Sequence, residues 1–204
     1  MIVGVNTAGS GDLDSTGAIS DAGATSVTVT MLADVAGTAI SLGGGTFDAG
    51  TLTFNSAGAV VISEDSDMDI VGVNTAGSAD LDSTGAISDA GATSVTVTGL
   101  TDAAGTSITL GGGTFDSGTL TFNSAGAVVI SEDSAMDIVG VNSAGRGGLD
   151  STGALSDAVA PTANATSTTH GSGPAPPPAE RQVQAGPAHY HTAEAREQAH
   201  QRDL

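Results

Sequence analysis

The sequence contains no cysteine, no tryptophan and no lysine, and aromatic residues make up only 2% of its 204 residues. The absence of cysteine excludes disulfide bonds, zinc-thiolate sites and thiol nucleophiles. The scarcity of aromatic side chains disfavours a single compact core, because large side chains normally supply most of the buried area of such a core. Gly, Ala, Ser, Thr and Asp dominate instead. This composition differs from that of an ordinary globular enzyme.

The charge balance is strongly acidic. Asp and Glu number 23 against four arginines, which gives a formal net charge of −19. Nucleic acids and anionic membrane surfaces both require a basic surface on their protein partner, so both classes of partner are excluded. Residues 1–14 contain neither the basic nor the apolar region of a signal peptide, and no run approaches the ~20 apolar residues of a membrane span. Taken literally, the chain would remain in the cytoplasm.

A repeat of 68 residues organises the chain. Residues 2–69 recur as residues 70–137 with eight substitutions and no insertion or deletion. A third copy begins at Ile138 and is recognisable as far as Ala158. A long fixed period of this kind predicts a repeat architecture.

Each copy reads as short strands separated by tight turns. Val95 and Val97 alternate with hydroxyl residues in "SVTVT", and Leu120 and Phe122 alternate with threonines in "TLTF", which indicates strands with one buried face. Further strands are expected at 106–110, 127–130 and 137–141, and turns at 89–92, 111–113, 116–118 and 123–126. No segment of the repeat has a helical apolar period. The chain is therefore predicted to be all-β.

The short strands favour a parallel β-solenoid (β-helix) over an antiparallel sandwich. A three-sided coil needs roughly 21 to 24 residues, so each copy would form about three coils and the array about seven. Small apolar residues from one coil would stack on the next about 4.8 Å away, whereas a sandwich of this size would call for aromatics. We expect right-handed coils. Asn6, Asn74 and Asn142 recur at strand ends, where their amides are expected to pair along the stack.

The strings "GTLTFNSAGAVVISEDSAMDIVG" and "LDSTGAISDAG" resemble the repeats of very large bacterial surface exoproteins. These are the filamentous-haemagglutinin-like and autotransporter-passenger proteins, and the resemblance covers residues 1–158. It implies a β-solenoid stalk on an exported and often adhesive protein. It therefore bears on fold and location more than on activity.

The composition changes abruptly after residue 158. Every His, every Pro and the only Tyr of the chain lie beyond this point. We therefore predict a solenoid array over residues 1–158 and a low-complexity, mostly disordered tail over residues 159–204. So sharp a change suggests a junction, and we expect the chain to be a fragment of a longer repeat protein.

The acidic turn "SEDSDMDI" at 63–70 and its copy at 131–138 are candidate calcium sites. The candidate ligands alternate along the chain and are Asp65, Asp67, Asp69, Asp133 and Asp137. A strict EF-hand is excluded, because Ile70 and Ala76 stand where its loop requires Gly and Glu. The glycine-aspartate strings at 43–50 and 111–118 also resemble calcium-binding β-roll motifs, but their glycines are misplaced. The alternative interpretation is a solvated acidic turn that binds no cofactor.

Catalysis is not expected. Asp12 with Asp14 and Asp80 with Asp82 are carboxylate pairs of the kind that polysaccharide-cleaving β-helices use as acid and base. An active site is a single constellation, however, whereas each of these carboxylates has a near-identical copy.

The sequence therefore predicts a non-enzymatic, structural or adhesive segment of a bacterial surface or secreted protein. The alternatives are a carbohydrate-active β-helix and a gene fragment without an independent function. The expected partners are extracellular glycans or a host or neighbouring cell surface, with end-to-end self-association through unpaired terminal coils.

Overall fold

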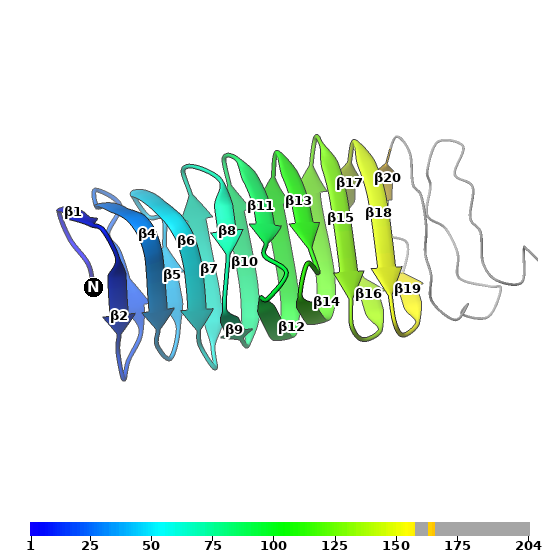
Figure 1. Cartoon of the computed structure of the whole chain (residues 1–204), viewed down its shortest axis with the longest axis horizontal. Helices are drawn as coiled ribbons and strands as arrows, with labels where there is room; N and C mark the ends of the chain where they lie inside the picture. Colours follow the sequence, from blue (N-terminus) through cyan, green and yellow to red (C-terminus); the bar gives the residue numbers. More distant parts are fainter. Residues whose placement is uncertain (158–162, 166–204) are drawn as a thin grey trace, which may run out of the picture.

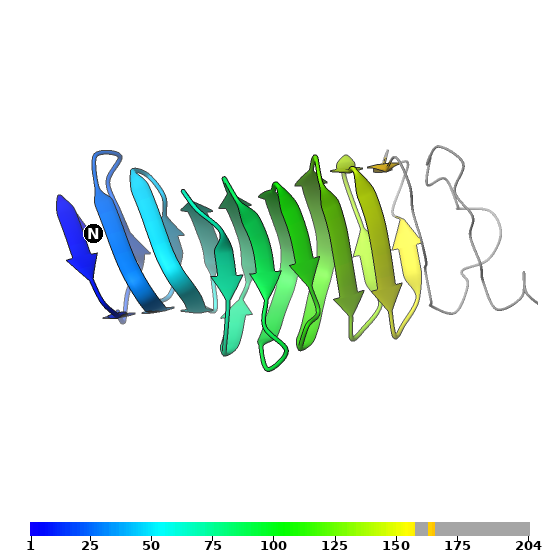
Figure 2. The same ribbon diagram turned by 45° about the horizontal axis from the view of Figure 1, so that its top comes forward.

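The protein is described by a computed structural model that covers residues 1–157 and 163–165. Its twenty strands form one continuous sheet in which the strand pairs run parallel. The sheet is wound into a β-solenoid of about 8 turns whose coils are stacked along the long axis (Figures 1 and 2). The all-β, parallel-solenoid prediction is confirmed. Among these residues, no helix is long and apolar enough to cross a membrane.

The strands are short, and most are separated by turns of a few residues. Their bounds are β1 Val5–Ala8, β2 Gly11–Asp14, β3 Ile19–Ser20, β4 Ser26–Ala36, β5 Ile40–Leu42, β6 Thr46–Asn55, β7 Ala59–Glu64, β8 Met68–Ile70, β9 Val73–Ala76 and β10 Ser78–Ser83. The chain continues with β11 Ala86–Asp89, β12 Ser94–Gly105, β13 Ser107–Leu110, β14 Thr114–Ser124, β15 Ala127–Glu132, β16 Met136–Ile138, β17 Asn142–Ala144, β18 Arg146–Ser151, β19 Leu155–Asp157 and β20 Ala163–Ala165.

One ladder of paired residues measures the length of each coil. It runs through Ile19, Ile40, Val60, Ala79, Thr101, Leu120, Ile138 and Asp157. The steps along this ladder are 18 to 22 residues, shorter than the 21 to 24 predicted, so the array holds about eight coils instead of seven. The physical reason is that β4 and β12 turn a corner within the strand, at register shifts after Val29 and Val97, and need no separate loop there.

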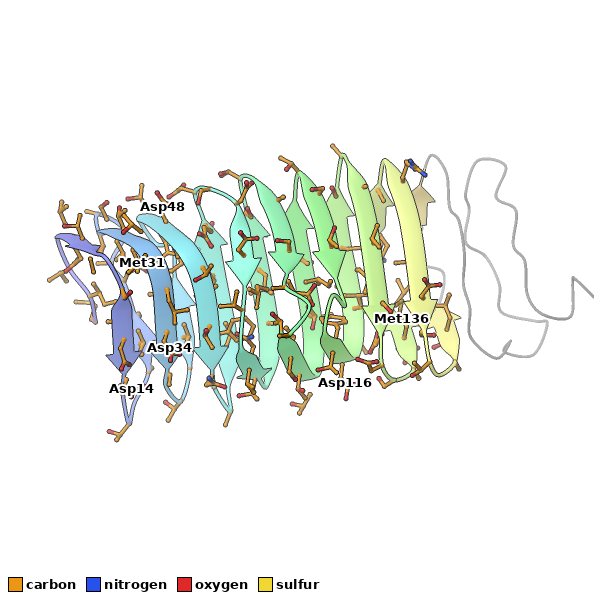
Figure 3. All side chains as sticks on the ribbon, viewed as in Figure 1. Asp14, Met31, Asp34, Asp48, Asp116 and Met136 are labelled. Carbon is orange, nitrogen blue, oxygen red and sulfur yellow. The ribbon has the colours of Figure 1, made fainter. Side chains whose placement is uncertain are left out.

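The sequence repeat does not match a whole number of coils. Three steps along the ladder lead from Ile19 to Ala79, sixty residues further on, whereas the copy of Ile19 is Ile87. Ile87 belongs to another ladder, between Met68 and Ile108. Two copies lead from Ile19 to Leu155, which lies two residues before Asp157 on the strand that ends the first ladder, about seven coils further on. Each copy therefore starts about half a turn later than the one before. Figure 3 shows this directly, because Asp48 and its copy Asp116 lie at opposite edges of the solenoid.

The core is a narrow column of inward-facing side chains. Val95, Val97, Leu120 and Phe122 are buried, as the alternation in "SVTVT" and "TLTF" predicts. The chain contains four phenylalanines, and every one is buried in this column, together with Ile, Leu, Val, Met and Ala residues. Because neighbouring parallel strands lie about 4.8 Å apart, these side chains stack directly and fill the interior without bulkier groups.

Two local predictions were wrong. The strand expected at 137–141 ends at Ile138, because Gly140 adopts a φ of 70° and bends the chain, as Gly72 does in the first copy. The turn expected at 116–118 lies inside β14, where the corner is a bend within the strand. Within the predicted tail, Ala163–Ala165 forms β20 and pairs with β17. Apart from these three residues, the predicted tail lies outside the described part of the chain.

The recurring asparagines do not stack on one another. Asn74 is fully buried; its Oδ1 accepts a hydrogen bond from the Phe54 amide at 2.8 Å, and its Nδ2 donates to the Val71 carbonyl at 2.9 Å. Asn142 bonds in the same way to the backbone of Phe122 and Val139. Since each copy is rotated, Asn74 and Asn142 lie in different ladders. Their role is to satisfy backbone groups where the chain bends.

Candidate functional site: the acidic corner

The acidic corner comprises residues 64–69, from the last residue of β7 into the start of β8. Its copy comprises residues 132–137, from the last residue of β15 into the start of β16. Met68 and Ile70 face the core with 0% exposure and hold the corner in place. Successive side chains of a strand point to opposite faces, so Asp67 and Asp69 face outward. The alternate spacing of these aspartates therefore follows from strand geometry.

Glu64 is an inward-facing residue at the end of β7. Its side chain is 1% exposed, and its Oε1 accepts a hydrogen bond from the Ala49 amide at 2.9 Å. The Ser66 hydroxyl lies 3.4 Å from the same oxygen and 2.9 Å from Asp48 Oδ1. The second carboxyl oxygen, Oε2, is buried and has no hydrogen-bond partner. A carboxyl group in this position lacks most of the contacts that stabilise a charge.

Glu132 reproduces this arrangement in the second copy. It is also 1% exposed, with Oε1 accepting from the Ser117 amide at 3.0 Å and Oε2 buried without a partner. Ser134 lies 3.2 Å from Glu132 Oε1 and 2.7 Å from Asp116 Oδ1. The geometry of the corner is therefore a property of the repeat, independent of the side of the solenoid on which it falls.

Burial is the main cause of the raised pKa values of both glutamates. The pKa of Glu64 is raised from 4.5 to about 7, mainly by burial; the hydrogen bonds from Ala49 and Ser66 oppose this rise, and the charges of Asp48 and Asp69 add to it. Burial likewise raises the pKa of Glu132, opposed by its bonds to Ser117 and Ser134. Both effects disfavour the charged form.

The three predicted metal ligands of the first copy each have a protein partner. Asp65 accepts a hydrogen bond from the Phe47 amide at 3.1 Å, and Asp67 accepts one from the Ala86 amide at 2.7 Å. Asp69 accepts from the Ser88 hydroxyl. Asp65 thus bonds to β6, and Asp67 and Asp69 both bond to β11. Their contacts join one coil to the next.

The predicted ligands of the second copy behave in the same way. Asp133 accepts from the Phe115 amide at 3.2 Å, and Asp137 accepts from the Ser156 hydroxyl. Within residues 1–157 and 163–165, no group of three or more His, Cys, Asp or Glu side chains is arranged to hold a metal ion. Calcium binding by these aspartates therefore stays a prediction, and the observed contacts are those of a structural turn.

The glycine triplets form a second kind of corner. The Asp21 carboxylate accepts hydrogen bonds from the amides of Gly43, Gly44 and Gly45 at 3.0 to 3.4 Å. Asp89 accepts from Gly111 and Gly112, both at 2.9 Å. A Cβ at Gly45 would lie 1.8 Å from the Thr25 carbonyl oxygen, so the position admits no larger residue. The glycines of "GGGTFD" therefore hold an aspartate of the neighbouring coil.

The carboxylate pairs considered as acid and base lie on outward faces. Asp80 on β10 is stacked on Asp102 of β12, and Asp82 follows two residues after Asp80. Partial burial raises the pKa of Asp80, and the charges of Asp82 and Asp102 raise it further. Partial burial also raises the pKa of Asp102, with Asp82 adding to the effect. Asp12 and Asp14 are exposed on β2.

Sequence reasoning overlooked Glu64 and Glu132, although a compositional signal marks them. They are the only glutamates in residues 1–165, where every other acidic residue is Asp. Each comes directly after "AVVIS", two residues after a buried isoleucine. Because every second residue of a strand points to the same face, this spacing predicts that the glutamate points inward. A glutamate placed where the pattern calls for an apolar residue is the feature that could have identified the site.

Comparisons with protein-family models, with curated proteins and with solved structures find no match to this chain.

Proposed function

We propose that this chain is a non-enzymatic structural segment of a bacterial surface or secreted repeat protein, where it serves as a stalk that spaces or presents an adhesive region. The observation that carries the proposal is the unbroken parallel stack of about 8 coils. Such a stack grows in length with each added repeat and keeps a constant cross-section, which are the properties required of a spacer. The resemblance of the repeats to bacterial exoproteins supports an extracellular location, as part of a longer exported protein.

The use of polar groups also supports a structural role. The carboxylates of the acidic corner and of Asp21 and Asp89 accept hydrogen bonds from neighbouring coils. The phenylalanines, which could otherwise stack against a sugar ring, are buried in the core. Such side chains serve the stability of the stack more than the binding of a small substrate.

Small-angle X-ray scattering on the full chain and on a version with one additional internal 68-residue copy tests the spacer role. One copy adds about three and a half coils, or roughly 17 Å at about 4.8 Å per coil. A rod that lengthens by this amount at constant cross-sectional radius is the expected result. An increase in the cross-sectional radius without a matching increase in length would contradict the proposal.

The expected partners are glycans or a cell surface, and a second copy of the chain. Val5 in β1 is 81% exposed, and β1 pairs only with β4 among the described strands. An open strand edge of this kind favours end-to-end association. Sedimentation velocity over a hundredfold concentration range should show growth by end-to-end addition, and a strictly monomeric species at high concentration would contradict it.

A carbohydrate-active β-helix is the second candidate, and the cluster of Asp80, Asp82 and Asp102 favours it. Partial burial and, to a smaller extent, repulsion from neighbouring carboxylates raise the pKa values of Asp80 and Asp102, a property that general acids require. Reducing-sugar release from a panel of acidic and neutral polysaccharides tests it. Activity that disappears in Asp80→Asn and Asp82→Asn, but not in Asp14→Asn, would replace the stalk proposal by an enzymatic one.

A further inference from the structure

Glu64 and Glu132 are the only charged residues among the buried side chains of the part of the chain that the structure describes. Each has one oxygen without a hydrogen-bond partner. A buried carboxylate is normally paired with a cation, because removing an unpaired charge from water is far more costly than burying a neutral acid. The surroundings of the two glutamates therefore decide whether they carry a charge.

The elements packed around Glu64 offer it no positive charge. Strand β6 contributes Asp48, β8 contributes Asp69, and β10, which pairs with β7, contributes Asp80 and Asp82. Strand β5, the other partner of β7, has no titratable residue. Every charged residue on these neighbouring elements is therefore negative.

The same holds close to Glu132. Strand β14 contributes Asp116, β16 contributes Asp137 and β18 contributes Asp150, while β13 has no titratable residue. The one cation is Arg146, which pairs with Ala127 at the far end of β15. It lies five residues along the strand from the position opposite Glu132, or about 17 Å. Its charge cannot replace a direct partner at that distance in salt.

The number of hydrogen atoms available for the hydrogen bonds of the acidic corner indicates that Glu64 is protonated. The Ser66 hydroxyl contacts both Asp48 Oδ1 and Glu64 Oε1, but it has a single hydrogen to donate. If both carboxyl groups were ionised, one of these contacts would have no hydrogen between its two oxygens. A proton on Glu64 supplies the missing one: Glu64 donates to Ser66, and Ser66 donates to Asp48. Ser134 stands in the same relation to Glu132 and Asp116.

We propose that Glu64 and Glu132 each hold a proton in the folded protein near neutral pH, and that losing these protons in mild alkali weakens the two acidic corners and the solenoid with them. Each 68-residue copy would then carry one proton-dependent joint between coils. The raised pKa values described above agree with this arrangement. The proposal does not depend on the stalk function.

The sign of the effect follows from linkage. The folded protein binds these protons more tightly than the unfolded chain, so their contribution to stability is complete below the ordinary value of 4.5. The contribution declines as the pH rises and is lost above the folded-state pKa, which is about 7 for Glu64. Stability should therefore fall with rising pH, opposite to the usual behaviour of carboxylates that are ionised and paired in the folded state.

A direct test follows the side-chain carboxyl ¹³C signals of the glutamates by NMR in the full chain, labelled with ¹³C-glutamate. A chelator is present throughout, because Asp65 and Asp133, next to the two glutamates, are predicted calcium ligands. The chain has five glutamates, and the signals of Glu64 and Glu132 are those missing from Glu64→Gln and Glu132→Gln respectively. We expect the Glu64 signal to titrate near pH 7 and the Glu132 signal above the ordinary range. Titration of both near pH 4.5 would overturn the proposal.

A second test compares urea unfolding midpoints from pH 5 to 8.5. Glutamine keeps the shape of the protonated acid and can donate to the serine at every pH, so Glu64→Gln and Glu132→Gln should match the unmodified chain at pH 5 and exceed its midpoint at pH 8.5. The exposed Asp14→Asn variant controls for the general relief of acidic repulsion. If the glutamine variants follow the unmodified chain across the range, or gain no more than Asp14→Asn, the proposal fails.

Discussion

The two complete copies of the repeat build nearly the same coils from sequences that differ at eight positions. Several of these differences lie in the core. Ala33 and Ala49 of the first copy become Thr101 and Ser117 in the second, and all four are buried. Val35 becomes Ala103, also buried. The inward-facing side chains are thus exchanged while the fold is retained.

The core substitutions compensate one another. The hydroxyl groups of Thr101 and Ser117 lie 2.7 Å apart and form a hydrogen bond, and the Ser117 hydroxyl also donates to the Thr119 carbonyl at 2.8 Å. The buried polar groups are therefore satisfied. The volume that Thr101 adds is offset two residues later, where Ala103 is smaller than Val35. Cores tolerate such changes when total volume and hydrogen bonding are maintained.

The acidic corner and the glycine-triplet corner, in contrast, differ between the copies at a single position. Glu64 and Glu132 each accept a hydrogen bond from the same backbone position, and Asp21 and Asp89 each accept from the first two glycines of a triplet. Core positions need only the right volume, whereas positions in these two corners need a particular donor, acceptor or absence of a side chain. The comparison teaches that these two corners define the fold more strictly than the core does.

The largest effect is expected at the glycine triplets. A Cβ at Gly113 would lie 1.9 Å from the Thr93 carbonyl oxygen, so Gly113→Ala must displace the backbone of the neighbouring coil. We expect the free energy of unfolding to fall by about 3 kcal/mol or more, measured by urea denaturation. Gly91→Ala is the control, because its Cβ would be 3.5 Å from the nearest atom. Equal stability of the two variants would contradict the prediction that position 113 admits no side chain.

A smaller loss is expected when the buried hydroxyl pair is broken. Ser117→Ala leaves the Thr101 hydroxyl, in a residue that is 0% exposed, without its partner and should cost about 1–3 kcal/mol. The double variant Thr101→Ala with Ser117→Ala restores the alanine pair of the first copy. Its cost should be less than the sum of the single variants by about 1 kcal/mol. Strict additivity in this cycle would show that the two substitutions are independent.

A still smaller effect is expected at the one position of the acidic corner that differs between the copies. Asp67 accepts a hydrogen bond from the Ala86 amide, while the second copy has Ala135 at this place. Because Asp67 is exposed, Asp67→Ala should cost less than about 1 kcal/mol by thermal or urea unfolding. A loss as large as that of Gly113→Ala would mean that the first corner depends on this carboxylate.

Calcium should have the smallest effect. The aspartates of both corners already accept hydrogen bonds from the protein, so millimolar calcium in place of a chelator should raise the melting temperature by less than about 2 °C. Circular dichroism of the full chain measures this. A rise of many degrees that Asp65→Asn and Asp133→Asn abolish would establish the calcium sites.

The sequence predicted the fold because the strand signal and the period are explicit. The alternation around Val95 and Leu120 identifies the buried face, and the absence of helical pattern leaves few architectures. The length of a coil could not be obtained in this way, since the bend after Val97 lies inside a strand and has no turn residues to mark it. The alternating aspartates drew attention to the outward face, whereas the unusual chemistry of the corner lies at Glu64, a glutamate at an inward position of the strand alternation.

The mismatch between 68 residues and a whole number of coils has a consequence for copy number. Loss or gain of one complete copy, as recombination between near-identical DNA repeats produces, would change the length of the array and also turn everything beyond it by about half a turn about the long axis. Two copies would restore the original azimuth. Variants that differ by a single repeat would therefore present a following domain in opposite directions, so that repeat number would select orientation as well as reach.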